Sequence, residues 1–213
     1  MSVEENRIIR TASTGLIIRP RGLTREHNTC IDSKLDPIRG DAQASPGGSF
    51  VWGNYLGRSD DATAARLRGN GVRATSYHPN CGMAKVAAEK ALGHSVSPSD
   101  ADEWAAQTTK KAAKKHGFGV IGFKKSDMCD CPDNSSIHII RPGVRNAPMS
   151  GFRINSITQN PVEAEKIARA VAASRGATDV KTFIHSTSQK DADKFKARLG
   201  HSNVQTNIVK RRS

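Results

Sequence analysis

Two cysteines and one histidine are the residues most able to do chemistry in this chain. Cys30 opens the segment Cys-Ile-Asp-Ser-Lys, and the segment His-Pro-Asn-Cys-Gly places His78 and Cys81 three residues apart. Two thiolates and an imidazole match the charge and softness that zinc prefers, and cadmium or cobalt would also fit. We therefore predict one transition-metal ion, Zn²⁺, on Cys30, His78 and Cys81. With three protein ligands, a fourth position stays open for water, as in catalytic zinc sites.

Other interpretations of these residues remain open. The two thiols and the histidine could simply be buried, or they could hold a structural zinc. Cys129 and Cys131, with His138 seven residues further on, could form half of a second metal site or supply a fourth ligand. Free thiols in a surface loop are the simpler interpretation, because the spacing of Cys129 and Cys131 is not the two-residue spacing of zinc ligands.

Residues 30–34 and 78–82 resemble the signature of the β-class carbonic anhydrases, which reads Cys-x-Asp-Ser-Arg and His-x-x-Cys-Gly. The resemblance covers residues 30–92. It implies a zinc lyase that interconverts carbon dioxide and bicarbonate by means of a zinc-bound hydroxide. It also implies that Cys30, His78 and Cys81 are ligands, that Asp32 and Lys34 are catalytic positions with Asp32 orienting the water, and that the protein forms a homo-oligomer.

The sequence departs from this family at three places. Lys34 stands where the family has an arginine, and a lysine lacks the planar fork that grips a carboxylate. The stretch 23–29, just before Cys30, is polar where the family has an apolar strand. Residues 44–48, Ala-Ser-Pro-Gly-Gly, look more like the cadmium-using ζ-class enzymes. These glycines either form an ordinary turn or present backbone N–H groups to an anion such as bicarbonate.

The net charge suggests a function of another class. The chain has 33 Lys and Arg residues against 20 acidic ones, a formal charge of +13. The alternative is therefore a basic nucleic-acid- or ribonucleoprotein-associated protein with a structural or remnant metal site. Because the basic residues are dispersed and aromatic residues are few, we expect only weak, salt-sensitive binding to nucleic acid.

Nothing in the sequence predicts a membrane protein. No apolar run approaches the roughly 18 residues that a spanning helix requires. Residues 1–10 carry two glutamates and no apolar core of a signal peptide. We expect a cytoplasmic location, where cysteines bind metal or stay free more often than they form disulfides.

The elements that position these residues alternate between strands and helices. Such alternation predicts an α/β fold with a mostly parallel central sheet flanked by helices, like that of the β-carbonic anhydrases. We expect a single domain over residues 1–213, with residues 1–25 as an N-terminal arm, residues 30–50 as loop and no internal repeat. The expected strands are 15–18, 72–77, 118–123, 137–140, 152–157, 179–185 and 204–209, and the expected helices are 60–68, 82–92, 97–115, 161–174 and 188–199.

Overall fold

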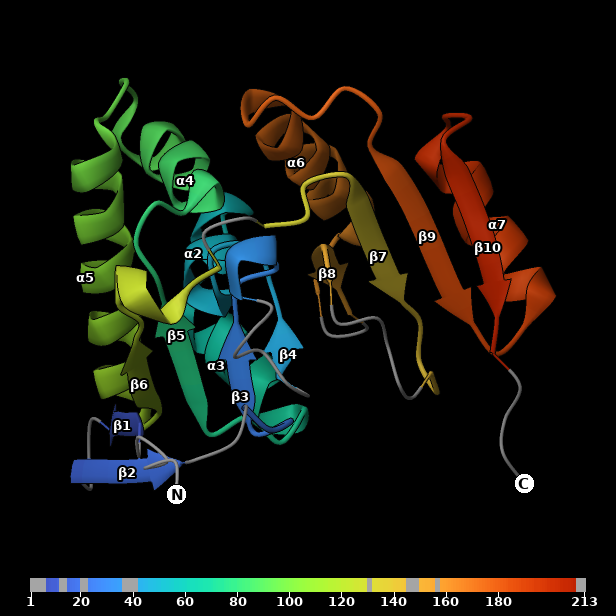
Figure 1. The fold of residues 1–213 in the computed structure, drawn as a ribbon. Coiled ribbons are helices and arrows are strands. Elements are labelled where there is room, and N and C mark those ends of the chain that lie inside the picture. Colours follow the sequence, from blue (N-terminus) through green and yellow to red (C-terminus); the bar gives the residue numbers. More distant parts are fainter. Residues whose placement is uncertain are drawn as a thin grey trace, which may run out of the picture.

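The computed structural model describes residues 7–11, 15–19, 23–35, 42–129, 132–144, 150–155 and 158–209. Its fold is α/β, as predicted, with the parallel strands divided between two four-stranded sheets (Figure 1). An antiparallel hairpin of β1 (Arg7–Thr11) and β2 (Gly15–Arg19) lies beside the first sheet, next to β6. None of the described helices is long and apolar enough to cross a membrane.

The first sheet has the order β4-β3-β5-β6, with all its strands parallel. Two helices lie between β4 and β5 along the chain, and two more lie between β5 and β6. The strands are β3 (His27–Thr29), β4 (Gln43–Ala44), β5 (Ala74–Tyr77) and β6 (Gly119–Gly122), and the helices are α2 (Ser49–Tyr55), α3 (Asp60–Gly69), α4 (Gly82–Leu92) and α5 (Pro98–His116).

The second sheet has the order β10-β9-β7-β8 and is also parallel throughout. One helix precedes each of its last two strands along the chain. The strands are β7 (Ser136–Ile140), β8 (Phe152–Ile154), β9 (Lys181–Ser186) and β10 (Val204–Ile208), and the helices are α6 (Pro161–Ser174) and α7 (Gln189–Leu199).

The two sheets repeat one topology. In each, the second strand along the chain lies at one edge, followed across the sheet by the first, third and fourth. The edge strand β4 is joined to the segment that follows the edge strand β8, since Asn155 accepts a 3.1 Å hydrogen bond from the Ala44 amide and Thr158 donates a 2.6 Å bond to the Ala44 carbonyl. The sequence shows no internal repeat, so this duplication is visible only in the topology.

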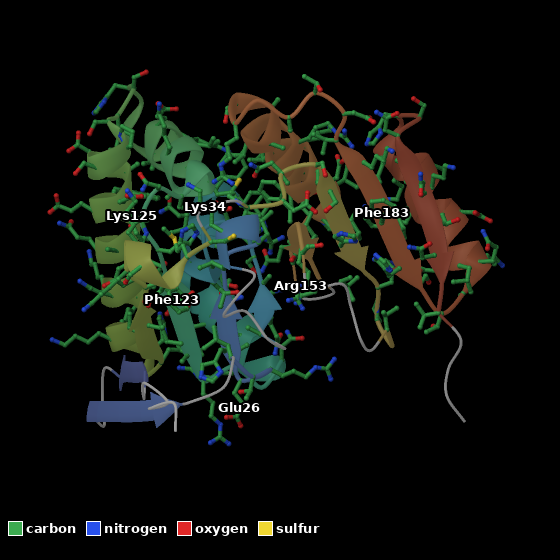
Figure 2. The ribbon with its side chains drawn as sticks, viewed as in Figure 1. Glu26, Lys34, Phe123, Lys125, Arg153 and Phe183 are labelled. Carbon is green, nitrogen blue, oxygen red and sulfur yellow. The ribbon has the colours of Figure 1, made fainter. Side chains whose placement is uncertain are left out.

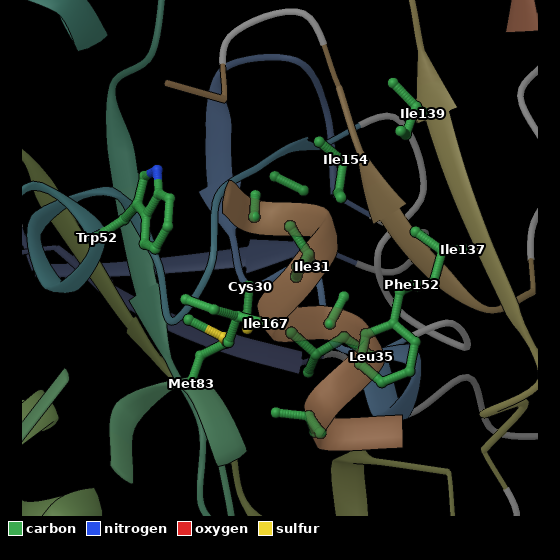
Figure 3. Packing of buried hydrophobic residues seen from close by; sticks show 14 of the residues in the cluster. Cys30, Ile31, Leu35, Trp52, Met83, Ile137, Ile139, Phe152, Ile154 and Ile167 are labelled. Atoms are coloured by element: carbon green, nitrogen blue, oxygen red, sulfur yellow. The ribbon is translucent and has the colours of Figure 1, made fainter. Parts of the chain in front are cut away.

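We call the first sheet with its helices, residues 27–122, the first half, and the second sheet with its helices, residues 136–208, the second half. Both halves contribute to one apolar core (Figure 3). Ile31 and Met83 of the first half pack with Phe152, Ile154 and Ile167 of the second, and these side chains are almost completely buried. On α6 the apolar residues recur at helical spacing, which places Ile167 and Val171 on the buried side of the helix. This shared core holds the carboxyl edge of the first sheet against the second half.

The predicted helices and the strands from residue 72 onward are confirmed, and their ends shift by one or two residues except in the predicted strand 152–157. That strand ends at Ile154, Asn155 is not part of it, and residues 156 and 157 lie outside the described residues. The prediction of a loop over residues 30–50 was wrong in part, because β4 and the start of α2 lie there. Helix α2 contains aromatic, β-branched and glycine residues of low helix propensity, and the burial of Phe50, Val51 and Trp52 stabilises it instead.

The polar stretch before Cys30 also forms a strand, β3, which the sequence did not predict. All three of its residues are buried. The Asn28 side chain accepts a 2.8 Å hydrogen bond from the Ser49 amide and donates to the Gln43 carbonyl, so its polar atoms are satisfied inside the protein. Hydrogen bonding therefore replaces the apolar packing that a buried strand normally uses.

Candidate metal centre

Three elements bring Cys30, His78 and Cys81 together. Cys30 follows β3, and His78 follows β5, the strand paired with β3. Because the two strands are parallel, their carboxyl ends meet at one edge of the sheet. The chain leaves β3 toward β4 on one side and reaches β5 on the other, so this edge is a topological switch point, where ligands bind in open α/β sheets. Cys81 is the N-cap residue, directly before α4.

The geometry of the cluster fits a metal ion. The potential ligand atoms of Cys30, His78 and Cys81 lie within 4.8 Å of one another, and the two sulfur atoms are 3.7 Å apart. Nδ1 of His78 lies 3.0 Å from the Pro79 carbonyl, which can only accept, so Nδ1 carries the proton. Nε2 is buried without a hydrogen-bond partner, as expected of an atom whose lone pair is directed at a metal.

A backbone amide also supports the sulfur of Cys30. Gly47 donates a 3.1 Å hydrogen bond to Cys30 Sγ, and Gly48 donates to the Ser45 carbonyl. A Cβ on Gly47, at φ +65°, would lie 2.6 Å from a methyl carbon of Val51, so glycine is needed for this approach. The suggestion that these glycines present N–H groups to an external anion is wrong, because both amides have partners within the protein.

The ionisation of the three residues is coupled. Burial alone would raise the pKa of Cys30, but Cys81 and the neighbouring His78 hold it well below its usual value. The hydrogen bond to Cys30, together with burial, raises the pKa of Cys81 well above its usual value. Burial opposes a charge on His78, but the adjacent Cys30 raises the pKa of this imidazole. Metal binding as two thiolates and a neutral imidazole should therefore release protons.

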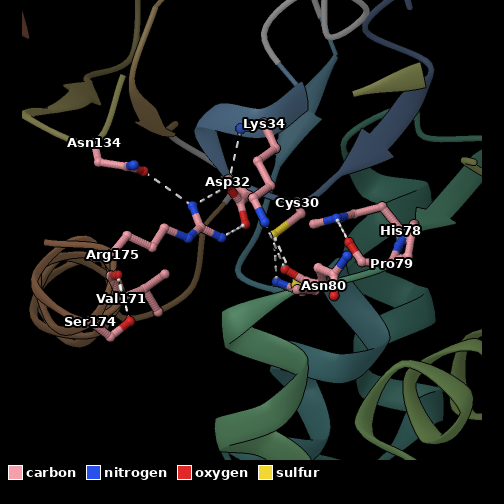
Figure 4. A network of polar contacts seen from close by, with 12 residues as sticks. Cys30, Asp32, Lys34, His78, Pro79, Asn80, Asn134, Val171, Ser174 and Arg175 are labelled. Atoms are coloured by element: carbon pink, nitrogen blue, oxygen red, sulfur yellow. Dashed lines mark hydrogen bonds and ion pairs between the residues drawn. The ribbon is translucent and has the colours of Figure 1, made fainter. Parts of the chain in front are cut away.

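Asp32 lies two residues after Cys30 and forms an ion pair with Arg175 (Figure 4). The guanidinium donates two hydrogen bonds to the carboxylate, of 2.6 and 2.8 Å, and a third of 3.2 Å to Asn134. Arg175 also lies over the ring of Phe152. Burial alone would raise the pKa of Asp32, but Arg175 and the charge of His78 lower it to about 2. Asp32 is therefore a fixed carboxylate at neutral pH.

Lys34 does not take the place of the arginine in this pair. Its backbone amide donates to Asp32, but its half-buried side chain is directed to the Asn80 carbonyl, 3.5 Å from the ammonium (Figure 4). Arg175 belongs to the second half of the molecule, where it is the C-cap residue directly after α6. It comes from the amino edge of the second sheet and reaches the carboxyl edge of the first, so both halves are needed to build the site.

The remaining cysteines are not part of the cluster as far as the structure describes them. Among the described residues, Cys30, His78 and Cys81 form the one group with metal-ligand geometry. Cys129 is half-buried and its amide donates to the Lys34 carbonyl, whereas Cys131 lies outside the described residues. The imidazole of His138 lies 3.0 Å from that of His185, in the second sheet.

Two residues of the site were missed from the sequence. Arg175 lies 143 residues after its partner, in a segment with no motif, so no local signal marks it. Asp102 of α5 accepts hydrogen bonds from the amides of Asn80 and Cys81, but its sequence context indicates only the start of a helix. Both residues reach the site only because the fold brings segments that are distant in sequence into contact.

No protein-family model matches the chain, and searches of curated proteins and of solved structures find no match either. The function must therefore be inferred from the residues and geometry of the site.

Proposed function

We propose that this protein is a zinc-dependent lyase of the carbonic anhydrase type, which hydrates carbon dioxide reversibly to bicarbonate. One observation carries the proposal: a buried carboxylate, Asp32, is held by Arg175 directly beside a three-residue metal cluster. A site that only binds a structural metal does not require a fixed anion at its border. The sequence resemblance to the β-class enzymes points to the same reaction.

The residues fit the requirements of this chemistry. Cys30, Cys81 and Nε2 of His78 would hold the zinc, which when bound supplies a Lewis acid that makes water acidic enough to yield hydroxide at neutral pH. Asp32 accepts a hydrogen bond from the attacking water and so orients it. Arg175 uses two donors to keep the carboxylate ionised and in one orientation, which a single lysine ammonium cannot do.

The alternative function, nucleic-acid binding, is suggested mainly by the net charge of +13. Side chains ending in nitrogen and in oxygen surround both halves of the molecule (Figure 2). On α5, where four lysines lie close together in sequence, Lys110 lies over the ring of Tyr77 and Lys115 pairs with Asp61. The pairing with Asp61 offsets one of the four lysine charges of this helix, and the other basic residues are dispersed along the chain, so we rank nucleic-acid binding below the lyase.

The test combines metal analysis with stopped-flow hydration of carbon dioxide. Asp32→Asn and Asp32→Ala should keep the zinc but lower the hydration rate by about 10²-fold or more, since Asp32 positions the nucleophile. Asp179→Ala is the matched control, because Asp179 is an exposed aspartate in the second half. Zinc-loaded parent protein without activity from about pH 6 to about pH 9 would refute the lyase.

A further inference from the structure

The loop that carries His78 and Cys81 receives support from a helix that contributes no ligand. This loop runs from the end of β5 to the start of α4 and contains Asn80, whose φ of +52° lies in the left-handed region. Such a conformation is tolerated by asparagine but not favoured, so neighbouring contacts must hold it. The loop must also keep two ligands three residues apart directed at one point.

Asp102, near the beginning of α5, supplies these contacts. Its two carboxylate oxygens accept hydrogen bonds from consecutive backbone amides, 2.7 Å from Asn80 N and 3.3 Å from Cys81 N. One side chain thereby fixes the peptide units on both sides of Asn80. The ionised acceptor makes these hydrogen bonds stronger than neutral ones.

One of these contacts also fixes the backbone of the residue that precedes α4. Cys81 is the N-cap residue of this helix, a position where serine, threonine, aspartate or asparagine normally folds its side chain back onto the helix amides. The Cys81 side chain makes no capping hydrogen bond, and its sulfur lies 3.7 Å from that of Cys30. A side chain at position 81 that folded back onto the helix amides could not serve as a ligand, whereas Asp102 holds residue 81 by its own backbone amide and does not engage the thiol.

We infer that Asp102 is a positioning residue of the metal centre: it holds the loop of residues 78–81 in the conformation that binds metal. Metal ligands that are held in place before binding lose less conformational entropy when the ion arrives. Removing a group that orients metal ligands typically lowers metal affinity by about tenfold to hundredfold. This inference rests on the metal centre of the proposed function, but not on the hydration of carbon dioxide.

Cobalt binding provides the test, because cobalt on thiolates gives a charge-transfer absorption that reports ligand geometry. Asp102→Asn should lower the cobalt affinity by about tenfold to hundredfold and alter this absorption. Glu103→Gln removes the same charge from the next residue of α5, which instead accepts from Gln107 on the helix surface, and should match the parent protein. Urea unfolding of the metal-free variants provides the stability of each.

The outcomes separate the inference from the proposed function. If Asp102→Asn is folded and binds cobalt with the affinity and spectrum of Glu103→Gln, the inference is wrong and the metal centre stands. A parent protein that binds neither cobalt nor zinc overturns both. A weaker affinity in Asp102→Asn, with an inactive but metal-loaded parent protein, supports the inference and contradicts only the lyase.

Discussion

The two halves of the molecule share a strand order but carry different chemistry at equivalent places. In the first half, the switch point between β3 and β5 carries Cys30, His78 and Cys81. In the second, the corresponding place between β7 and β9 carries Arg141, whose guanidinium donates bonds of 2.8 and 2.9 Å to Asp191 of α7.

This comparison shows that the strand topology determines where a site can form but not which chemistry it carries. In both halves the second and third strands along the chain lie on opposite sides of the first strand. The connections therefore leave an opening at the carboxyl ends of the strands. In the second half an internal ion pair fills it, and in the first half side chains with metal-ligand geometry converge there. The first site also draws Arg175 from the second half, which joins the two halves through a buried ion pair.

The largest expected effect concerns the metal itself. Purified parent protein should contain about one zinc per chain, and Cys81→Ser should lose most of it, because a serine hydroxyl is a poor zinc ligand. Cys129→Ser is the control, since Cys129 lies outside the cluster and should retain the parent content. Atomic absorption of the dialysed proteins measures both. Full retention in Cys81→Ser, Cys30→Ser and His78→Ala would exclude the metal centre.

The next effect compares the two ion pairs. Arg175→Ala should lower the free energy of unfolding by about 3–5 kcal/mol, because it leaves Asp32 charged and only 3% exposed. Arg141→Ala should cost about 1 kcal/mol or less, because Asp191 is 37% exposed and water can solvate it. Urea unfolding of the metal-free proteins measures both values.

A second measurement tests the cause of that difference. Combining Arg175→Met with Asp32→Leu should recover most of the loss, since no charge is then left buried. Equal costs for the two arginine variants would mean that the pairs are equally solvated and that the contrast between the halves does not hold.

The smallest expected effect tests the packing between the halves. A Cβ on Gly82 of α4 would lie 2.8 Å from a methyl carbon of Val171 on α6, so Gly82→Ala should destabilise the protein by about 1–3 kcal/mol. Gly69→Ala in α3 meets nothing within 4 Å and should instead stabilise the protein by about 0.5–1 kcal/mol. Thermal unfolding compares them, and stabilisation of both would show that α4 and α6 have room to separate.

Much of the fold could be predicted from local sequence, because local interactions specify those elements. Helix α6 begins at a proline that follows a capping asparagine and keeps a helical apolar period, and its predicted bounds, 161–174, match the structure. Helix α2 and strand β3 could not be predicted in this way. Their residues have low intrinsic preference for these states, and burial or hydrogen bonds to distant residues stabilise them.

The same division applies to the site. The types and spacing of Cys30, His78 and Cys81 were sufficient to predict the cluster, because two ligands lie in one loop and the third follows a neighbouring strand. The partner of Asp32 was decided only by the tertiary structure. The packing of α6 against the first half brings Arg175 within 2.6 Å of that carboxylate, and a contact across 143 residues leaves no mark in the local sequence.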